Sequence, residues 1–155
     1  MADSPPLTVE ATRAVIRRLG ELTDRIVLVG GQAIAFWVDH YRDRDPVAKL
    51  GPVYSNDIDF CAKPDEVKLC AEKLGGRSKV PEPFSHTPNT GVVEFVDTDG
   101  TARAIDFLGH PFGLDYDDVV KKAVRVVLLD DLKQPTGLHM LVMHPMHCLE
   151  SRVHN

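Results

Sequence analysis

The sequence predicts an α+β (mixed α/β) fold, in which one mixed β-sheet is flanked by helices within a single domain. Short apolar runs, typical of buried strands, alternate along the chain with longer segments that begin with helix-capping residues. Asp99-Gly100 joins two strand-like segments directly, which indicates an antiparallel hairpin beside strands that helices connect. The 155 residues are 43% hydrophobic, enough for one core of single-domain size.

The N-terminal part is predicted to form a helix, a strand and a second helix. Thr8 can cap the first helix, and the continuous apolar run after it suits a buried strand. In order, we expect a flexible tail over 1–6 and a domain over 7–155 that begins with a helix from Thr8 to about Leu19, a strand over Ile26–Val29, a helix from Gln32 to about Tyr41 and a loop over 42–56.

The remaining elements follow from proline, glycine and apolar runs. Pro64 and Pro145 suit the first position of a helix, and Gly75-Gly76 can end one. We expect strands over Asp57–Ala62, Gly91–Asp97, Thr101–Leu108, Val124–Leu129 and Leu138–Met143, helices over Pro64–Leu74, Asp115–Lys122 and Pro145 to the C-terminus, an irregular segment over 79–90 and a turn at Gln134–Gly137.

Composition excludes several classes of protein. A net charge of −5 does not favour binding of nucleic acid by bulk charge. No apolar stretch approaches the ~18 residues that span a bilayer, and the N-terminus lacks the pattern of a signal peptide. Cys61, Cys70 and Cys148 form no Cys-x-x-Cys pair and are expected to be free thiols, with Cys61 in the core. We therefore expect a cytoplasmic protein.

Two acids stand at the start of the second predicted strand. Asp57 and Asp59 are two residues apart, so their side chains project from the same face, while Ile58 and Phe60 face the core. Adjacent carboxylates repel each other unless a cation neutralises them or one is protonated. Mg²⁺ prefers such oxygen ligands and often bridges to substrate phosphates. The pair alone is also compatible with a solvated strand end.

Two further features favour a phosphate site. Gly30-Gly31, between a strand and a helix, lets the backbone approach a phosphate closely at a helix N-terminus, although a plain tight turn has the same pattern. Asp106 lies among large apolar residues and needs a metal or a partner, for which Arg103 or Arg125 would serve.

The predicted hairpin bears on the choice of a third acid. A two-residue turn at Asp99-Gly100 would set Val93 opposite Asp106 and turn Glu94 to the other face, whereas a longer turn would reverse that parity. In the C-terminal part, His144 and His147 have a spacing that could suit a transition metal, but Pro145 makes His144 a residue before the helix. We therefore favour Asp106 over Glu94 and do not assign a histidine metal site.

Together, Leu28-Val29-Gly30-Gly31-Gln32-Ala33, Asn56-Asp57-Ile58-Asp59-Phe60 and Ala104-Ile105-Asp106-Phe107-Leu108 resemble the DNA polymerase β-type nucleotidyltransferase superfamily. The resemblance is greatest to its small prokaryotic branch, which includes AbiEii-like toxins and minimal nucleotidyltransferases. It implies an enzyme that transfers a nucleoside monophosphate from an NTP to a hydroxyl acceptor with Mg²⁺ or Mn²⁺, as a toxin–antitoxin or phage-defence component.

Residue by residue, the resemblance implies the following roles. Gly30 and Gly31 would line the nucleotide phosphates, with a hydrogen bond from Ser55 or Asn56. The acids Asp57, Asp59 and Asp106 would form the catalytic metal site, and Asp106 would also help to deprotonate the acceptor hydroxyl.

The acceptor is expected to be RNA, a protein or a small molecule, and a protein partner or a second copy of the chain is also expected. The main alternative is a catalytically inactive nucleotidyltransferase fold that serves as a binding or assembly module. Three converging acids count against that alternative, because an inactive scaffold has no use for their repulsion. A weaker alternative is a metal-dependent phosphodiesterase or nuclease, which would not need a triphosphate cradle at Gly30-Gly31.

Overall fold

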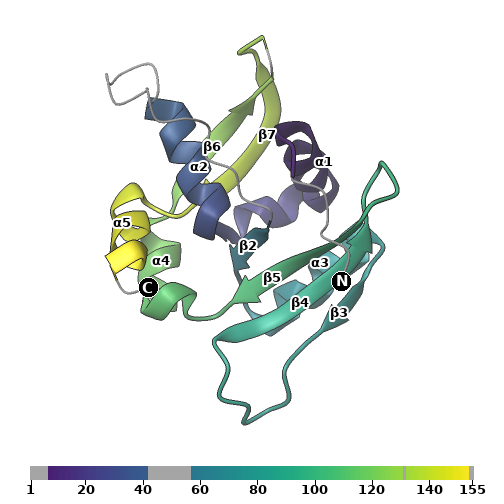
Figure 1. Cartoon of the computed structure of the whole chain (residues 1–155), viewed down its shortest axis with the longest axis vertical. Helices are drawn as coiled ribbons and strands as arrows, with labels where there is room; N and C mark the ends of the chain where they lie inside the picture. Colours follow the sequence, from purple (N-terminus) through teal and green to yellow (C-terminus); the bar gives the residue numbers. More distant parts are fainter. Residues whose placement is uncertain (1–6, 42–56, 131, 154–155) are drawn as a thin grey trace.

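A computed structural model describes residues 7–41, 57–130 and 132–153. Over these residues, five α-helices pack around one seven-stranded mixed sheet, which confirms the α+β class (Figure 1). The predicted tail over 1–6 and the predicted loop over 42–56 lie outside the described residues. In chain order the elements are α1 (Val9–Leu19), η1 (Gly20–Asp24), β1 (Val27–Val29), α2 (Gly30–Tyr41), β2 (Ile58–Cys61), α3 (Pro64–Leu74), β3 (Arg77–Lys79), β4 (Asn89–Val96), β5 (Ala102–Leu108), η3 (Pro111–Gly113), α4 (Tyr116–Lys122), β6 (Val124–Leu129), β7 (Pro135–Val142) and α5 (Pro145–Val153).

The strands are ordered β3-β4-β5-β2-β1-β7-β6 across the sheet. Strand β2 lies in the middle, antiparallel to β1 and parallel to β5. Strand β1 is in turn parallel to β7. The sheet therefore brings the end of β1, the start of β2 and the middle of β5 next to one another, although they are far apart in the sequence.

Local sequence signals set the ends of several helices where they were predicted. The Thr8 hydroxyl accepts a hydrogen bond from the Ala11 N–H at 3.0 Å and caps α1. Helix α3 begins at Pro64 and ends before Gly75, whose φ of 62° is a left-handed conformation that glycine adopts without strain. Asp115 caps α4 by accepting from the Asp118 N–H at 3.2 Å.

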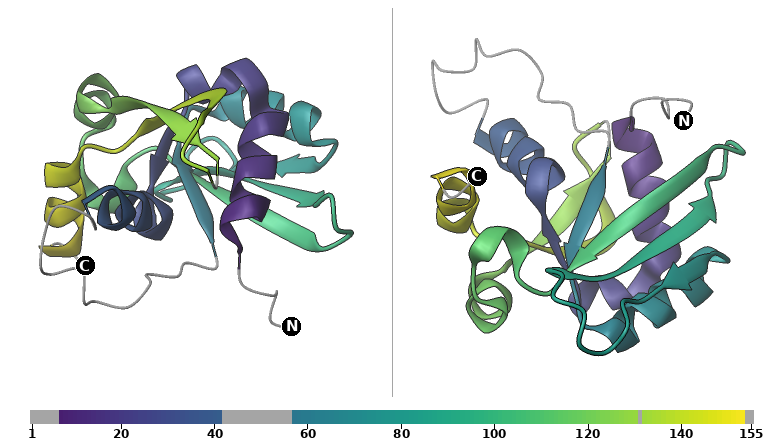
Figure 2. Two further views of the ribbon diagram at one scale, coloured as in Figure 1. Left: turned by 90° about the horizontal axis from the view of Figure 1, so that it is seen from above. Right: turned by 60° about the horizontal axis from the view of Figure 1, so that its bottom comes forward.

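The core lies between the sheet and the helices α1 and α3. Alternate residues of the central strands face these helices, and the rings of Phe60 and Phe107 stack there with centroids 6.0 Å apart. Helices α2, α4 and α5 are grouped at the opposite end of the molecule (Figure 2). The other face of β4 and β5 is the open face of the sheet. It consists of Val92, Glu94, Val96, Ala102, Ala104 and Asp106.

Helix α2 is attached to the C-terminal part of the chain through the single tryptophan. Trp37 Nε1–H donates to the carbonyl oxygen of Met143 at 2.8 Å, at the junction of β7 and α5. The N–H of Met143 donates to the carbonyl oxygen of Leu28 in β1 at 2.9 Å. Phe36 and Trp37 pack against the core.

The three thiols are free, as predicted, and Cys61 is in the core, as predicted; Cys70 and Cys148 are buried as well. Burial raises the pKa of Cys61 and of Cys70 to about 12, and that of Cys148 to about 11. Because the reactive form of cysteine is the thiolate, these side chains act as small core residues. None of the helices in the described part of the chain is both long and apolar enough to cross a bilayer.

The register predicted for the β4–β5 hairpin is wrong by one residue. The N–H of Asp97 donates to the carbonyl oxygen of Thr101 at 2.8 Å, and Gly100 has a φ of 84°, so the turn has three residues instead of two. Val92, not Val93, is therefore opposite Asp106. This reverses the predicted parity and places Glu94 on the same face as Asp106.

A buried ion pair fixes this turn. Arg103 Nε lies 3.1 Å from Asp97 Oδ2, and the two side chains are only 6% and 1% exposed. The second oxygen of Asp97 accepts a hydrogen bond from the N–H of Thr98 at 2.8 Å. The carboxylate is thus satisfied at the base of the three-residue turn, which explains why the longer turn is preferred to a two-residue one.

Two other predictions near strand ends are corrected. Strand β7 begins at Pro135, so most of the predicted turn at Gln134–Gly137 belongs to the strand. The chain turns before it, where Asp130 Oδ1 accepts hydrogen bonds from the N–H groups of Leu132 and Gln134. Gly137, with a φ of 78°, is inside β7 at a register irregularity. Strand β3 was not predicted, because its residues are all polar and exposed and carry no apolar alternation.

Candidate functional site

The predicted acids lie on two neighbouring parallel strands. Asp59 of β2 is directly in register with Asp106 of β5, so the two side chains leave the sheet on the same face. Asp57 comes two residues before Asp59, directly ahead of β2, and is exposed. The flanking Ile58 and Phe60 are buried in the core and hold the strand in this orientation.

Asp59 also meets the glycine turn at the start of α2. It is in register with Val29, the last residue of β1, and its carboxylate lies against the Cα of Gly30. A Cβ at Gly30 would stand 2.5 Å from Asp59 Oδ2, too close for any side chain. Gly30 also has a φ of 69°, which other residues rarely adopt. The backbone conformation therefore favours glycine at this position, and any other residue would also displace the Asp59 carboxylate.

The carboxylates are electrostatically strained against one another. Partial burial, followed by the charges of Asp106 and Asp57, raises the pKa of Asp59 to about 6. Burial, followed by the charge of Asp57, also raises the pKa of Asp106. Such shifts are typical of clustered carboxylates that bind a cation or take up a proton.

The arginines considered as partners of Asp106 bind other acids. Arg103 points to the opposite face of β5 and pairs with Asp97, and Arg125 of β6 lies 3.4 Å from Asp24. Asp106 is thus not held in place by either of these ion pairs. Glu94, now on the same face as Asp106, is paired with Lys79 at 2.9 Å and lies further along the hairpin.

The donor set suits a hard divalent cation, because carboxylate oxygens are the preferred ligands of Mg²⁺ and Mn²⁺. Within residues 7–41, 57–130 and 132–153, no three His, Cys, Asp or Glu side chains are arranged so that they could hold a metal ion by themselves. A cation at the acids would therefore need oxygens from a substrate or from water to complete its coordination. Near the C-terminus, His144 Nδ1 accepts a hydrogen bond from the N–H of Met146, which agrees with a capping role.

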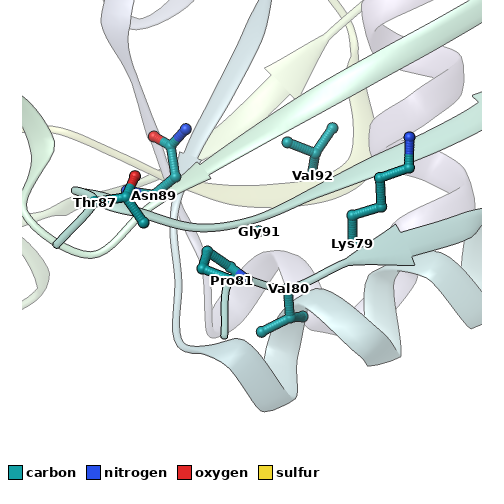
Figure 3. Close-up of a pocket in the computed structure, with 7 residues that line it drawn as sticks. All are labelled: Lys79, Val80, Pro81, Thr87, Asn89, Gly91 and Val92. Carbon is teal, nitrogen blue, oxygen red and sulfur yellow. The ribbon is translucent and has the colours of Figure 1, made fainter. Parts of the chain in front are cut away.

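A shallow groove beside β4 was not expected from the sequence. Its volume is about 270 Å³, and it is open to solvent beside the irregular β3–β4 connection (Figure 3). Val92 contributes to the groove and is the residue directly opposite Asp106. The groove could be predicted only from a sequence analysis that also predicted strand β3 and the correct register of the β4–β5 hairpin. Its lining residues are Lys79, Val80, Pro81, Thr87, Asn89, Gly91 and Val92.

The fold thus brings together four of the predicted site residues: Gly30, Asp57, Asp59 and Asp106. Gly31 follows as the second residue of α2 and is half-buried. Ser55 and Asn56, predicted to add a hydrogen bond to the phosphates, lie outside the described residues.

Comparisons with known proteins do not assign a family. No protein-family model matches the chain, and no curated protein matches it. The resemblance to nucleotidyltransferases therefore stands on the order of the glycine turn and the acids in the sequence.

Proposed function

We propose that this chain is a metal-dependent nucleotidyltransferase of the DNA polymerase β type, most similar to the small AbiEii-like branch, and that it acts in the cytoplasm. It would transfer a nucleoside monophosphate from an NTP to a hydroxyl group of RNA, a protein or a small molecule. One observation carries the proposal: Asp59 is in register with Asp106 and at the same time lies against Gly30 at the start of α2.

Each residue of the site has a role that its surroundings support. The N-terminus of α2, which begins with Gly30 and therefore carries no side chain at its first position, would bind the phosphates of the nucleotide, which the helix dipole attracts. Asp57 and Asp59 would hold Mg²⁺ or Mn²⁺. When bound, that cation would stabilise the negative charge that develops as the acceptor hydroxyl displaces pyrophosphate from the α-phosphorus of the NTP.

Asp106 would serve the acceptor. Its raised pKa makes its carboxylate a better proton acceptor than an ordinary aspartate, so one of its oxygens would take the proton of the attacking hydroxyl. The groove lined by Val92, the residue paired with Asp106 across the hairpin, would offer a place for the acceptor. Hydrogen-bonding side chains of Thr87 and Asn89 and apolar contacts from Val80 and Pro81 suit a hydroxylated ligand or chain segment.

The direct test combines a transfer assay with thermal unfolding. Purified protein is incubated with each labelled NTP, Mg²⁺ and a cell extract, and the variants Asp57→Asn and Asp59→Asn are compared with the wild type. Both variants should lose transfer and lose the rise in melting temperature that Mg²⁺-NTP gives the wild type. Glu72→Gln is the matched control, because it removes an exposed acid from α3, the helix on the opposite side of the sheet.

The outcomes separate the candidate functions. Transfer that depends on Asp57 and Asp59 supports the enzyme. Stabilisation by Mg²⁺-NTP without transfer to any component of the extract supports the inactive binding module instead. A wild type that none of the four NTPs stabilises with Mg²⁺ would overturn the nucleotide site altogether.

A further inference from the structure

In the part of the chain that the structure describes, one edge of the sheet is apolar and has no strand beyond it. Strand β6 is last in the strand order and, among the described residues, pairs only with β7. It has six residues, Val-Arg-Val-Val-Leu-Leu, with neither proline nor glycine among them. A strand of this kind presents unpaired N–H and C=O groups and readily adds another strand.

The side chains of this edge are exposed as well. Val127 and Leu129 are 46% and 44% exposed, and Leu132 in the adjoining hairpin is 80% exposed. At the other edge of the sheet, β3 has three residues, all polar or charged and all exposed. Short, charged edges of that kind resist pairing. Only the β6 edge is therefore suited to adding a strand, which favours contact between two identical edges over an open chain of copies.

We propose that β6 pairs antiparallel with β6 of a second copy of this chain, about a two-fold axis at Val127. A two-fold axis perpendicular to the sheet keeps each side chain on its own face, so residues of the same parity must lie opposite each other. An axis at Val127 pairs residues 125–129 of the two copies, which is all of β6 except Val124. Val127 then faces Val127 of the second copy, and Val126 faces Leu128.

The charges of the strand agree with this register. Arg125 is the only charged residue of β6, and its guanidinium group lies 3.4 Å from Asp24 of its own chain. In the proposed pairing Arg125 lies opposite Leu129, whose side chain can cover the aliphatic stem of the arginine. The two copies of Arg125 are four residues apart along the strands, roughly 13 Å, so no like charges face each other.

The oligomeric state in solution is the first test, and it uses the intact chain. Sedimentation or light scattering should give twice the 17.2 kDa mass of one chain at high concentration, falling towards the monomer on dilution. Val127→Lys should shift the midpoint of this dissociation to at least tenfold higher concentration. Val96→Lys is the matched control and should not, because Val96 is 58% exposed on β4, which already has a strand on each side.

A wild type that stays monomeric at high concentration, or a dimer that Val127→Lys leaves unchanged, would overturn the proposal. Cysteine cross-linking tests the register independently and does not depend on the stability of the lysine variant. Across the proposed axis, the Cα atoms of residue 127 would be ~5 Å apart, within the range that a disulfide spans, whereas those of residue 129 would be roughly 13 Å apart.

Val127→Cys should therefore form a covalent dimer under mild oxidation at least ten times faster than Leu129→Cys. The native thiols are buried and give little background. Equal rates for the two variants, or no cross-link in Val127→Cys while the dimer is present, would overturn the proposed register and the pairing with it.

Discussion

Replacing Asp59 by asparagine removes a charge from the acidic site and keeps the shape of the side chain. The pKa of Asp59 is raised from its ordinary value of 3.8 to about 6, first by burial and then by Asp106 and Asp57. A difference of that size corresponds to about 3 kcal/mol between the two protonation states. Because Asp59 is only half-buried, solvent screening reduces the effect on stability to about 1–2 kcal/mol.

The sign of the effect depends on pH. The pKa of Asp59 is higher in the folded chain than in the unfolded chain. The contribution of protonated Asp59 to the free energy of unfolding is therefore fully present below the unfolded pKa of 3.8 and is lost as the pH rises through about 6. Without a divalent cation, Asp59→Asn should therefore match the wild type near pH ~4 and be about 1–2 kcal/mol more stable near pH ~7.5. In melting temperature this is roughly 3–6 °C for a chain of this size.

The measurement is urea unfolding of both proteins in chelator at the two pH values, with Glu72→Gln as the control for loss of an exposed charge. The control should show no comparable change between the two pH values. If Asp59→Asn differs from the wild type by the same amount at both pH values, or is less stable at the higher one, the carboxylate is not strained and the electrostatic description of the site is wrong.

Three further predictions test other parts of the structure. Gly30→Ala should lower the free energy of unfolding by about 2–3 kcal/mol, because of the positive φ at this position and the contact with Asp59. Part of that loss should disappear in an Asp59→Ala background. Full additivity of the two substitutions in a double-mutant cycle would argue against the contact. Gly31→Val should weaken binding of Mg²⁺-ATP, measured by calorimetry, more than it lowers the melting temperature; unchanged affinity in a folded variant would remove the phosphate role of this turn. Asp97→Ala should cost about 3–5 kcal/mol in urea unfolding because it leaves Arg103 buried without this partner, and a loss below about 1 kcal/mol would contradict the importance of that ion pair.

Local signals were sufficient for most elements of this fold. Helix α3 has the predicted bounds because proline at its start and glycine at its end act within one turn of the chain. Strand β6 also has its predicted bounds, since a continuous apolar run between polar residues is a strong signal. Strand β3 has no such signal and forms because it can pair with β4.

The residues of the candidate site could be named from the sequence, but their positions relative to one another could not. The spacing of Asp57 and Asp59 fixes their common face, whereas the registers of Asp59 with Asp106 and with Val29 depend on strand order, which no local pattern encodes. The position of Glu94 was missed for a related reason. A turn longer by one residue, stabilised by the buried Asp97, reverses the face of every residue in β4 relative to β5.

The hydrogen bond between Trp37 and the Met143 carbonyl gives the protein an internal fluorescence probe. Trp37 is the only tryptophan in the chain, and its indole N–H is bound to the Met143 carbonyl, in the link from β7 to α5. The fluorescence of Trp37 should therefore report whether α2 is packed against the link from β7 to α5. Helix α2 is also the helix that starts at Gly30. Emission from this one indole can follow ligand binding or unfolding at the glycine turn without an added label, and the signal does not have to be divided among several tryptophans.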